Sequence, residues 1–535
     1  MPQPEPAGQS EARFTRRVGL FSFGTLISRV LGLVRESVFA HLFGAGLATD
    51  AFNVAFRIPN FFRDLFAESA LSAAFVPAFV QSLRRDDRDQ TWRFAANVLN
   101  AVALSVGLVV IAGLLFTPVV VRVVALGFAD EPAKLALTTL LTRVMFPFLL
   151  FVAFAAWAMG VLNACGTFFT PAVAPAAFNV VSIAVPLATY GLLRERGLDP
   201  ILGMAAGVTL GSVAQFLVQV PRLLRHGFRW RPVLDLRQPG LRRVFTRWLP
   251  MMLGYATWQV NFLVNTFLLT FLAEGSVTWV SYAYRIQHLP AGLFGAAIGS
   301  VALAEYSHEA AGDSPTAIGE RFRHAMGLVA ALTIPAAVLL FVLAGPVVQL
   351  IYQHGRFTAL DAHLTTQALM LYCLGIWSAA ATRNCAAGFY SLGDTRTPAL
   401  VAVGVVAANV VLNLILMRFI EFRSFPLATS LVQAAYFVLL FLLLRRRVGN
   451  LHGRHIAGVS LRTLLAAAGA GLAAWLASRA LSRLPLPGFW LHFARVACGG
   501  AVGLALFYLL ARLLRVKEVQ LAVRAVLDRF RGHGR

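Results

Sequence analysis

The feature that most constrains this chain is a series of apolar runs, each long enough to cross a lipid bilayer. One of them, residues 98–121, carries no charged side chain. About 20 apolar residues in a helix cross the roughly 30 Å hydrocarbon core of a membrane. Lipid offers no hydrogen-bond partner to the backbone, and the runs lack the alternating pattern of barrel strands, so each must be a helix. The sequence therefore predicts an all-α polytopic membrane protein.

The composition agrees with this class. Of the 535 residues, 58% are hydrophobic and only 13% are charged, whereas a soluble domain has about 25% charged residues. We expect fourteen transmembrane helices in the chain. The predicted spans are residues 18–41, 49–80, 92–125, 135–164, 170–193, 199–220, 245–272, 277–304, 318–350, 363–391, 397–417, 425–445, 459–480 and 490–515.

The positive charge of the chain indicates its orientation. The formal net charge of +23 would suit a nucleic-acid-binding protein, but the arginines fall mostly in short loops between apolar runs. Residues 221–247 hold eight arginines against one aspartate, and the alternate loops are nearly free of cations. Basic loops face the cytoplasm and anionic lipid. We therefore predict cytoplasmic termini, membrane lipids as partners and no nucleic-acid partner.

Two internal repeats predict the domain organisation. Residues 55–75 align without gaps to residues 283–303, and "GTFFTPA" at 166–172 resembles "GDTRTPA" at 393–399. Both pairs are offset by about six spans, which predicts two six-helix lobes related by a pseudo-twofold axis along the membrane normal, followed by two further helices. The predicted parts are a disordered tail (1–17), an N-lobe (18–220), a basic linker (221–247), a C-lobe (248–445), a C-terminal helix pair (446–515) and a basic tail (516–535).

Several arginines lie inside predicted spans. A charged side chain at the centre of a bilayer costs about 2.5–3.5 kcal/mol on insertion scales, so it usually marks a functional site. Arg35 and Arg57 could instead extend to the headgroups. A shared water-filled cavity explains the whole set better. The set comprises Arg29, Arg35, Arg57, Arg63 and Arg285.

Nearby acids compensate these cations only in part. Glu36 follows Arg29 by seven residues and Asp64 follows Arg57 likewise, so each pair shares a helix face. Glu68 and Asp50 are also close, although Asp50 could instead cap the second span. At least one arginine then remains unpaired, and its planar fork of donors suits phosphate or carboxylate.

The stretch "IPNFF" predicts a bend in the second span. Pro59 removes one backbone donor, and the side chain of Asn60 could satisfy the freed carbonyl. A bend there would serve as a hinge beside the arginines, so Asn60 joins the candidate substrate-binding residues.

No catalytic motif is present in the sequence, and neither the histidines nor the cysteines have metal-ligand spacing. We therefore predict a transporter, not an enzyme, with no metal or cofactor and with a gradient or the membrane potential as its energy source. Two alternatives remain: an exporter of a lipid-linked oligosaccharide, and a membrane scaffold that docks partners through residues 221–247. A polyprenyl-phosphate glycosyltransferase would need acidic residues in a loop that faces its donor, and the predicted extracytoplasmic loops are too short and too poor in acids. A scaffold would tolerate Arg29→Ala and Arg285→Ala.

Several stretches resemble one known family. "SRVLGLVRESVFAHLFGAGLATDAFN" (28–53), "YRIQHLPAGLFGAAIGS" (284–300) and "GFYSLGDTRTPAL" (388–400) are similar to motifs of the MurJ (MviN) lipid II flippases, in the multidrug/oligosaccharidyl-lipid/polysaccharide exporter superfamily. The resemblance implies fourteen helices and a role in peptidoglycan biosynthesis. It implies that lipid II, the undecaprenyl-pyrophosphate-linked precursor, moves from the inner to the outer leaflet of the bacterial cytoplasmic membrane by alternating access. It further implies a monomer, with the cell-wall synthesis machinery as a partner.

The resemblance also assigns roles to residues. It implies that Arg29, Arg35, Arg63 and Arg285 are cavity arginines, that Asp50 is functional, and that Arg57 occupies a Lys/Arg position. Tyr284 and His288 stand where relatives often carry acids, so the cavity here is more positive. The sodium site of some members would fall on Asn265, Asn409, Asn413 and Thr429. Amides without carboxylates bind a cation weakly, so either a monovalent cation or the membrane potential could drive transport.

Overall fold

The computed structural model describes residues 7–66, 70–85, 87–310, 315–521 and 523, and this part of the chain contains helices and no strand. By its internal contacts the chain divides into two compact units, Met1–Gly275 and Ser276–Arg535, and each is described here by itself. The prediction of an all-α polytopic protein is confirmed. Nine segments of the described residues are long and apolar enough to cross a membrane. The count of fourteen crossings stays a prediction.

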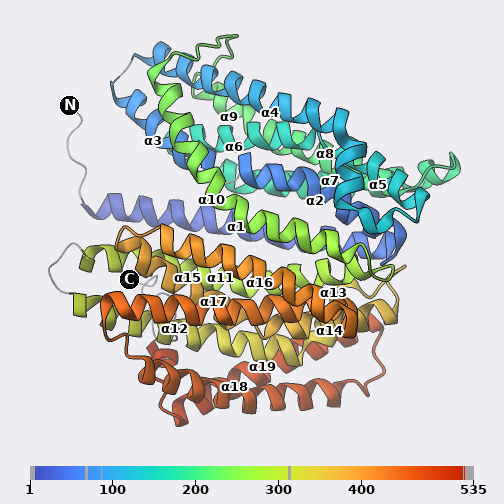
Figure 1. Ribbon diagram of the computed structural model, residues 1–535, viewed down its shortest axis with the longest axis vertical. Helices are drawn as coiled ribbons and strands as arrows, with labels where there is room; N and C mark the ends of the chain where they lie inside the picture. The colour runs from blue at the N-terminus through green and yellow to red at the C-terminus, as the bar shows by residue number, and fades with distance from the viewer. Residues whose placement is uncertain (1–6, 67–69, 86, 311–314, 522, 524–535) are drawn as a thin grey trace. The chain divides into compact units, whose positions relative to one another are not determined.

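Unit 1 is a bundle of long helices joined by short turns (Figure 1). Helix α7 packs against both α1 and α8, α2 packs against α5, and α3 packs against α6. The helices are α1 (Ala7–Phe43), α2 (Leu47–Phe66), α3 (Ala70–Arg85), α4 (Arg88–Val124), α5 (Pro132–Met145), α6 (Phe148–Ala164), α7 (Phe169–Glu195), α8 (Ile201–Leu217), α9 (Val220–Arg225) and α10 (Pro239–Leu269), with a 3-10 turn, η1, at Leu126–Phe128.

Small residues allow α7 and α8 to pack closely against each other in unit 1. A Cβ added at Gly211 of α8 would lie 2.8 Å from the carbonyl oxygen of Phe178 in α7, and one at Gly207 would lie 3.3 Å from that of Ser182. Glycine at these positions lets the two backbones approach, which is how helices pack where lipid supplies no hydrophobic driving force.

Unit 2 contains the remaining helices, and α18 and α19 lie side by side within it (Figure 1). Helix α11 packs against α12, α14 and α15, while α18 packs against α12. The helices are α11 (Ser276–Ala310), α12 (Pro315–Val342), α13 (Ala344–Tyr352), α14 (Ala359–Cys373), α15 (Ile376–Ser391), α16 (Arg396–Ile420), α17 (Ser424–Val448), α18 (Gly453–Leu481) and α19 (Gly488–Leu513), with a 3-10 turn, η2, at Glu421–Arg423.

The fourth and tenth predicted spans are interrupted in the same way. The fourth divides into α5 and α6 around Pro147, and the tenth divides into α14 and α15 just before Ile376. These spans belong to the second sequence repeat, so both units repeat the same local irregularity. The predicted second span is described in two parts, α2 and α3, and Glu68 lies outside the described residues.

Two predicted boundaries differ from the structure. Residues 7–17 are helical as the start of α1, where the sequence predicted a disordered tail. Helix α10 belongs to unit 1, although the C-lobe was predicted to begin at residue 248. The ring of Trp248 is buried and its centroid lies 5.7 Å from that of Phe66 in α2. This aromatic contact ties α10 to the first unit.

The basic linker is held against α4 and is not a free loop. Asn97 donates from Nδ2 to the carbonyl of Asp235 at 2.9 Å and accepts from the Asp235 amide at 2.8 Å. Asn100 donates to the carbonyls of Arg231 and Val233 at 2.7 and 2.9 Å. Two asparagines one turn apart therefore supply hydrogen-bond partners to backbone groups of the extended segment that precedes α10.

Candidate functional site

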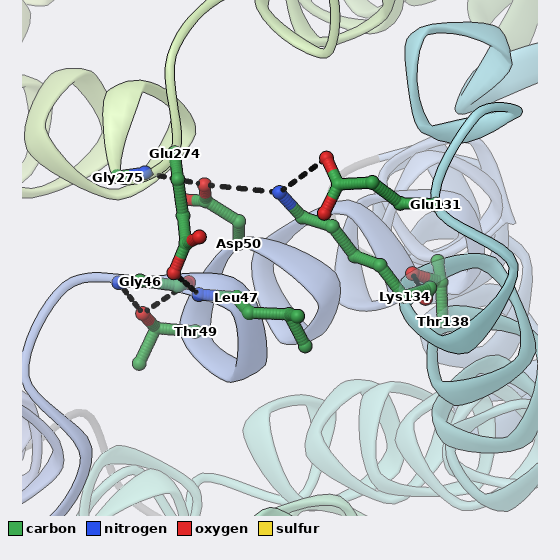
Figure 2. Close-up of polar contacts among 9 residues, drawn as sticks. All are labelled: Gly46, Leu47, Thr49, Asp50, Glu131, Lys134, Thr138, Glu274 and Gly275. Atoms are coloured by element: carbon green, nitrogen blue, oxygen red, sulfur yellow. Dashed lines mark hydrogen bonds and ion pairs between the residues drawn. The ribbon is translucent and has the colours of Figure 1, made fainter.

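A buried ion pair lies at the start of α2 (Figure 2). Oδ2 of Asp50 is 3.8 Å from Nζ of Lys134 in α5, and each side chain is 2% exposed. The same oxygen accepts a hydrogen bond from the amide of Gly275 at 2.7 Å. Nζ of Lys134 also lies 3.8 Å from Oε1 of Glu131 and 4.2 Å from the ring centroid of Phe128. These contacts join α2, α5 and the residue that precedes α11.

The alternative role of Asp50 as a helix cap is wrong. The helix begins at Leu47, so Asp50 lies within its first turn. The amide of Leu47 instead donates to Oε1 of Glu274 at 2.6 Å, and the amide of Gly46 donates to Oγ1 of Thr49 at 2.9 Å. Because the carboxylate of Asp50 is buried against Lys134, it neutralises that lysine and positions α2.

The sequence analysis missed Lys134. A signal was available, because Lys134 and Lys517 are the only lysines among the 47 basic residues of the chain. Arginine keeps a broad fork of donors, whereas lysine places a compact charge on a flexible stem and so fits a narrow buried site.

The two arginines of α1 have different surroundings. Arg35 pairs with Glu36, with Nη2 2.7 Å from Oε1, and its guanidinium lies 5.3 Å from the ring centroid of Phe178 in α7. Arg29 is exposed and has no ion-pair partner among the residues that the structure describes. The predicted pairing of Arg29 with Glu36 is therefore wrong, and the cation of Arg29 is uncompensated.

Helix α2 carries the next candidates along a single strip. Asp64 pairs with Arg63, with Nη2 2.6 Å from Oδ1, and accepts a hydrogen bond from Nδ2 of Asn60 at 3.3 Å. The expectation that Asp64 pairs with Arg57 is wrong, as is the expectation that Asn60 satisfies a backbone carbonyl. The guanidinium of Arg57 instead lies 5.0 Å from the ring centroid of Phe262 in α10. The helix continues through Pro59.

In unit 2, Arg285 of α11 is half-buried, and its guanidinium lies 5.9 Å from the ring centroid of Tyr282. The ring of Tyr284 stacks on His288 at 5.3 Å and meets Tyr372 edge-on at 5.7 Å. Arg383 lies on α15, which packs against α11, and the sequence analysis missed it. The sequence did offer a signal for Arg383, because it is the single arginine inside the tenth predicted span. The shared cavity of Arg285 with the arginines of unit 1 stays a prediction.

The candidate ion-site residues are only partly brought together. On α16, Nδ2 of Asn413 donates to Oδ1 of Asn409 at 3.1 Å, and both side chains are buried. Thr429 lies on α17, which packs against α16, whereas Asn265 belongs to α10 in unit 1. Over the described ranges, no group of three or more His, Cys, Asp or Glu residues could hold a metal ion.

Unit 2 also contains an apolar cavity of about 450 Å³. It lies between α12, the adjoining ends of α14 and α15, and α18. Its lining includes Ile334, Phe341, Trp377, Leu461 and Leu464. Such a cavity suits a hydrocarbon chain and not a polar headgroup.

Comparison with solved structures defines the class of protein. The chain is similar in fold to "Lipid II flippase MurJ, inward closed conformation", with a TM-score of 0.73 and 24% identity over 92% of this chain and 99% of that one. It is also similar to an inward-facing multidrug resistance MATE transporter of the MOP superfamily, with a TM-score of 0.63 and 15% identity over 80% of this chain and 96% of that one. The chain therefore shares its fold with these two structures.

Sequence comparison then gives the family. The profile of the family "Lipid II flippase MurJ" matches residues 39–492. The "Probable lipid II flippase MurJ" of Vibrio cholerae serotype O1 is 35% identical over 446 residues, which cover 81% of this chain and 82% of that protein. The chain belongs to the MurJ family, as the sequence resemblance predicted. The matched residues include Asp50, Arg57, Asn60, Arg63 and Arg285.

Proposed function

We propose that this chain flips lipid II from the inner to the outer leaflet of the bacterial cytoplasmic membrane for peptidoglycan synthesis. Membership of the MurJ family supports the substrate. The observation that carries the proposal is the uncompensated cation of Arg29, an exposed guanidinium in a helix of a multi-pass membrane protein. A guanidinium binds phosphate through two parallel hydrogen bonds, so a lipid diphosphate offsets the cost of keeping it there.

The buried pair strengthens this argument. Asp50 is buried and forms an ion pair with Lys134, so its negative charge is not available to the arginines. Asp64 and Glu36 each pair with the arginine next to them in sequence. These three acids are thus already paired, and Arg29 is left for an anionic headgroup. The lining of the apolar cavity in unit 2 suits, by itself, a hydrocarbon chain such as a polyprenyl tail.

The cycle that we propose is alternating access with both termini in the cytoplasm. The headgroup binds at the arginines while the tail stays in lipid. A membrane potential that is positive outside would then return the unloaded cationic cavity inward. Sodium is not required, because the matching positions Asn409 and Asn413 are amides that bond to each other. The chain acts as a monomer, as a transporter without catalytic chemistry, and it supplies lipid II to the cell-wall synthesis machinery.

Depletion of the protein in its host tests the proposal. A probe for lipid II accessible at the outer leaflet should lose its signal, and the wild-type gene should restore it. Arg29→Ala and Arg285→Ala should fail to restore it, whereas Arg122→Ala, an exposed arginine of α4, should succeed. Full restoration by Arg29→Ala at normal protein abundance would indicate a scaffold and reject the flippase. Normal lipid II exposure in depleted cells that accumulate another lipid-linked oligosaccharide would indicate a different substrate.

A further inference from the structure

A half-buried arginine of the C-terminal helix pair has only neutral hydrogen-bond partners. Arg495 lies two turns into α19. Its Nε donates to Oγ of Ser478 in α18 at 3.4 Å, and its Nη1 donates to Oε1 of Gln349 in α13 at 3.3 Å. No carboxylate among the described residues pairs with it. Both bonds are long for this kind of hydrogen bond. The guanidinium is thus placed between α13, α18 and α19, and its charge is uncompensated because both partners are neutral.

A second basic side chain lies next to this arginine. His492 lies one turn earlier on α19, and its Nδ1 is buried without a hydrogen-bond partner in the part of the chain that is described. Ser478, Gln349, His492 and Arg495 therefore form one polar cluster in which Arg495 carries a permanent positive charge, and we call it the Arg495 cluster.

The Arg495 cluster lies at the level of lipid headgroups. The residues after Arg495, 496–511, are apolar. Before it, the rings of Phe489, Trp490 and Phe493 contact one another, with centroids 5.5 and 6.1 Å apart, and each is about half exposed. Exposed aromatic rings next to an apolar helix are typical of the boundary between membrane and water. Arg495 follows these rings by two residues, so it lies close to the same level of the membrane, where phosphates are present.

The sidedness of the cluster is unusual for a cation. Helix α18 has 29 residues, about 44 Å at 1.5 Å each, so it crosses the roughly 30 Å core once. The turn between α18 and α19 therefore faces away from the basic residues that precede α18. Arg479 and Arg483 lie near the same turn. Cations are depleted on that side of a membrane, so an anionic ligand explains why three arginines remain there.

We propose that the Arg495 cluster binds the phosphate of an anionic lipid headgroup, in the leaflet that the α18–α19 turn faces. The phosphate oxygens accept from the fork of Arg495 and from His492. The alkyl chains extend from the headgroup toward the apolar residues 496–511, a contact that free phosphate cannot make. This site is separate from the proposed transport of lipid II, and Arg495 lies beyond residue 492, where the family match ends.

Lipid titration of the purified full-length protein in a neutral detergent tests the site. Phosphatidylglycerol is added, and bound lipid is counted by native mass spectrometry. Arg495→Gln should weaken binding about tenfold, which corresponds to ~1.4 kcal/mol. Arg512→Gln provides the matched control, because Arg512 is an exposed arginine at the other end of the same helix. Its affinity should equal that of the wild type.

Three further arms keep the result interpretable. Arg495→Lys retains the charge without the fork and should bind with intermediate affinity. His492→Gln leaves the bonds of Arg495 to α13 and α18 intact and should weaken binding about threefold, so it tests the site even if Arg495→Gln misfolds. Inorganic phosphate at the lipid concentration should not displace the lipid.

Equal affinity of the wild type, Arg495→Gln and His492→Gln would overturn the proposal, as would displacement by phosphate alone. Binding in detergent requires no transport, so neither result bears on the flippase proposal.

Discussion

Replacing Lys134 by methionine should destabilise unit 1 strongly. Methionine has a similar length and no charge, so the substitution leaves the carboxylate of Asp50 buried without its cation. At the 3.8 Å separation of the pair, Coulomb's law with an effective dielectric constant of about 20 gives an attraction of about 4 kcal/mol. Removing one partner of a buried pair typically costs about 3–5 kcal/mol, because the stranded charge stays desolvated. We therefore expect the free energy of unfolding to fall by about 3 kcal/mol.

The structure predicts an asymmetry between the two partners. In Asp50→Asn the lysine is stranded, but Glu131 remains 3.8 Å from Nζ and is half exposed, so it can still compensate the charge. Asp50→Asn should therefore cost less than Lys134→Met. The double variant carries no stranded charge and should recover most of the loss, because neutral replacement of a buried pair is often tolerated.

Unfolding in mixed micelles with increasing sodium dodecyl sulfate, followed by tryptophan fluorescence, measures these free energies. Lys517→Met is the matched control, because Lys517 is the other lysine of the chain and is exposed. It should change the free energy by less than about 0.5 kcal/mol. If Lys134→Met is no less stable than Lys517→Met, or if the double variant is as unstable as the sum of the single ones, the buried pair is not an energetic contact and the reasoning fails.

Three further outcomes are expected. Gly127→Ala should destabilise the protein by about 1–3 kcal/mol, because its Cβ would overlap the backbone of Thr270; Gly107→Ala, whose Cβ meets open space, should cause no loss in the same unfolding titration. Hydrogen bonds from Thr397 hold the pKa of Asp394 below its ordinary value of 3.8. Its contribution is therefore present above about pH 4 and is lost as the pH falls through the lowered pKa. The difference in unfolding midpoint between wild type and Asp394→Asn should be constant from about pH 5 to 8 and should shrink as the pH falls below about 4. Replacing sodium by choline should leave lipid II exposure unchanged in intact cells while dissipation of the membrane potential abolishes it; the reverse pattern would restore sodium as the driving ion.

The candidate site was predictable in its residue types but not in its pairings. Arg29, Arg57 and Arg63 stand out in the sequence because charge is rare in apolar runs. Their partners do not, because helical periodicity makes residues seven apart look like neighbours, whereas Arg63 pairs with the adjacent Asp64. Periodicity places side chains on a face, but rotamers and the packing of other helices decide which of them meet.

Asp50 shows the same limit at longer range. Its position after a glycine turn suggested a helix cap, and that local interpretation could not include Lys134 on α5 or the amide of Gly275. Both partners are far from it in sequence and near it only after folding. The division of the chain depended on folding for the same reason, since aromatic contacts of α10 attach it to unit 1.

The sequence by itself determined the membrane class, the all-helical fold and the family. It also showed that the two repeats are about six predicted spans apart. Hydropathy, composition and motif spacing are properties of single segments, and a bilayer imposes helices on any long apolar run. Only the tertiary structure decided which charges are neutralised, that Arg29 and Arg495 have no acidic partner among the described residues, and where Arg495 meets three helices. Those properties depend on distances of a few ångströms between segments far apart in the chain, because electrostatic interactions and hydrogen bonds act only at such short range.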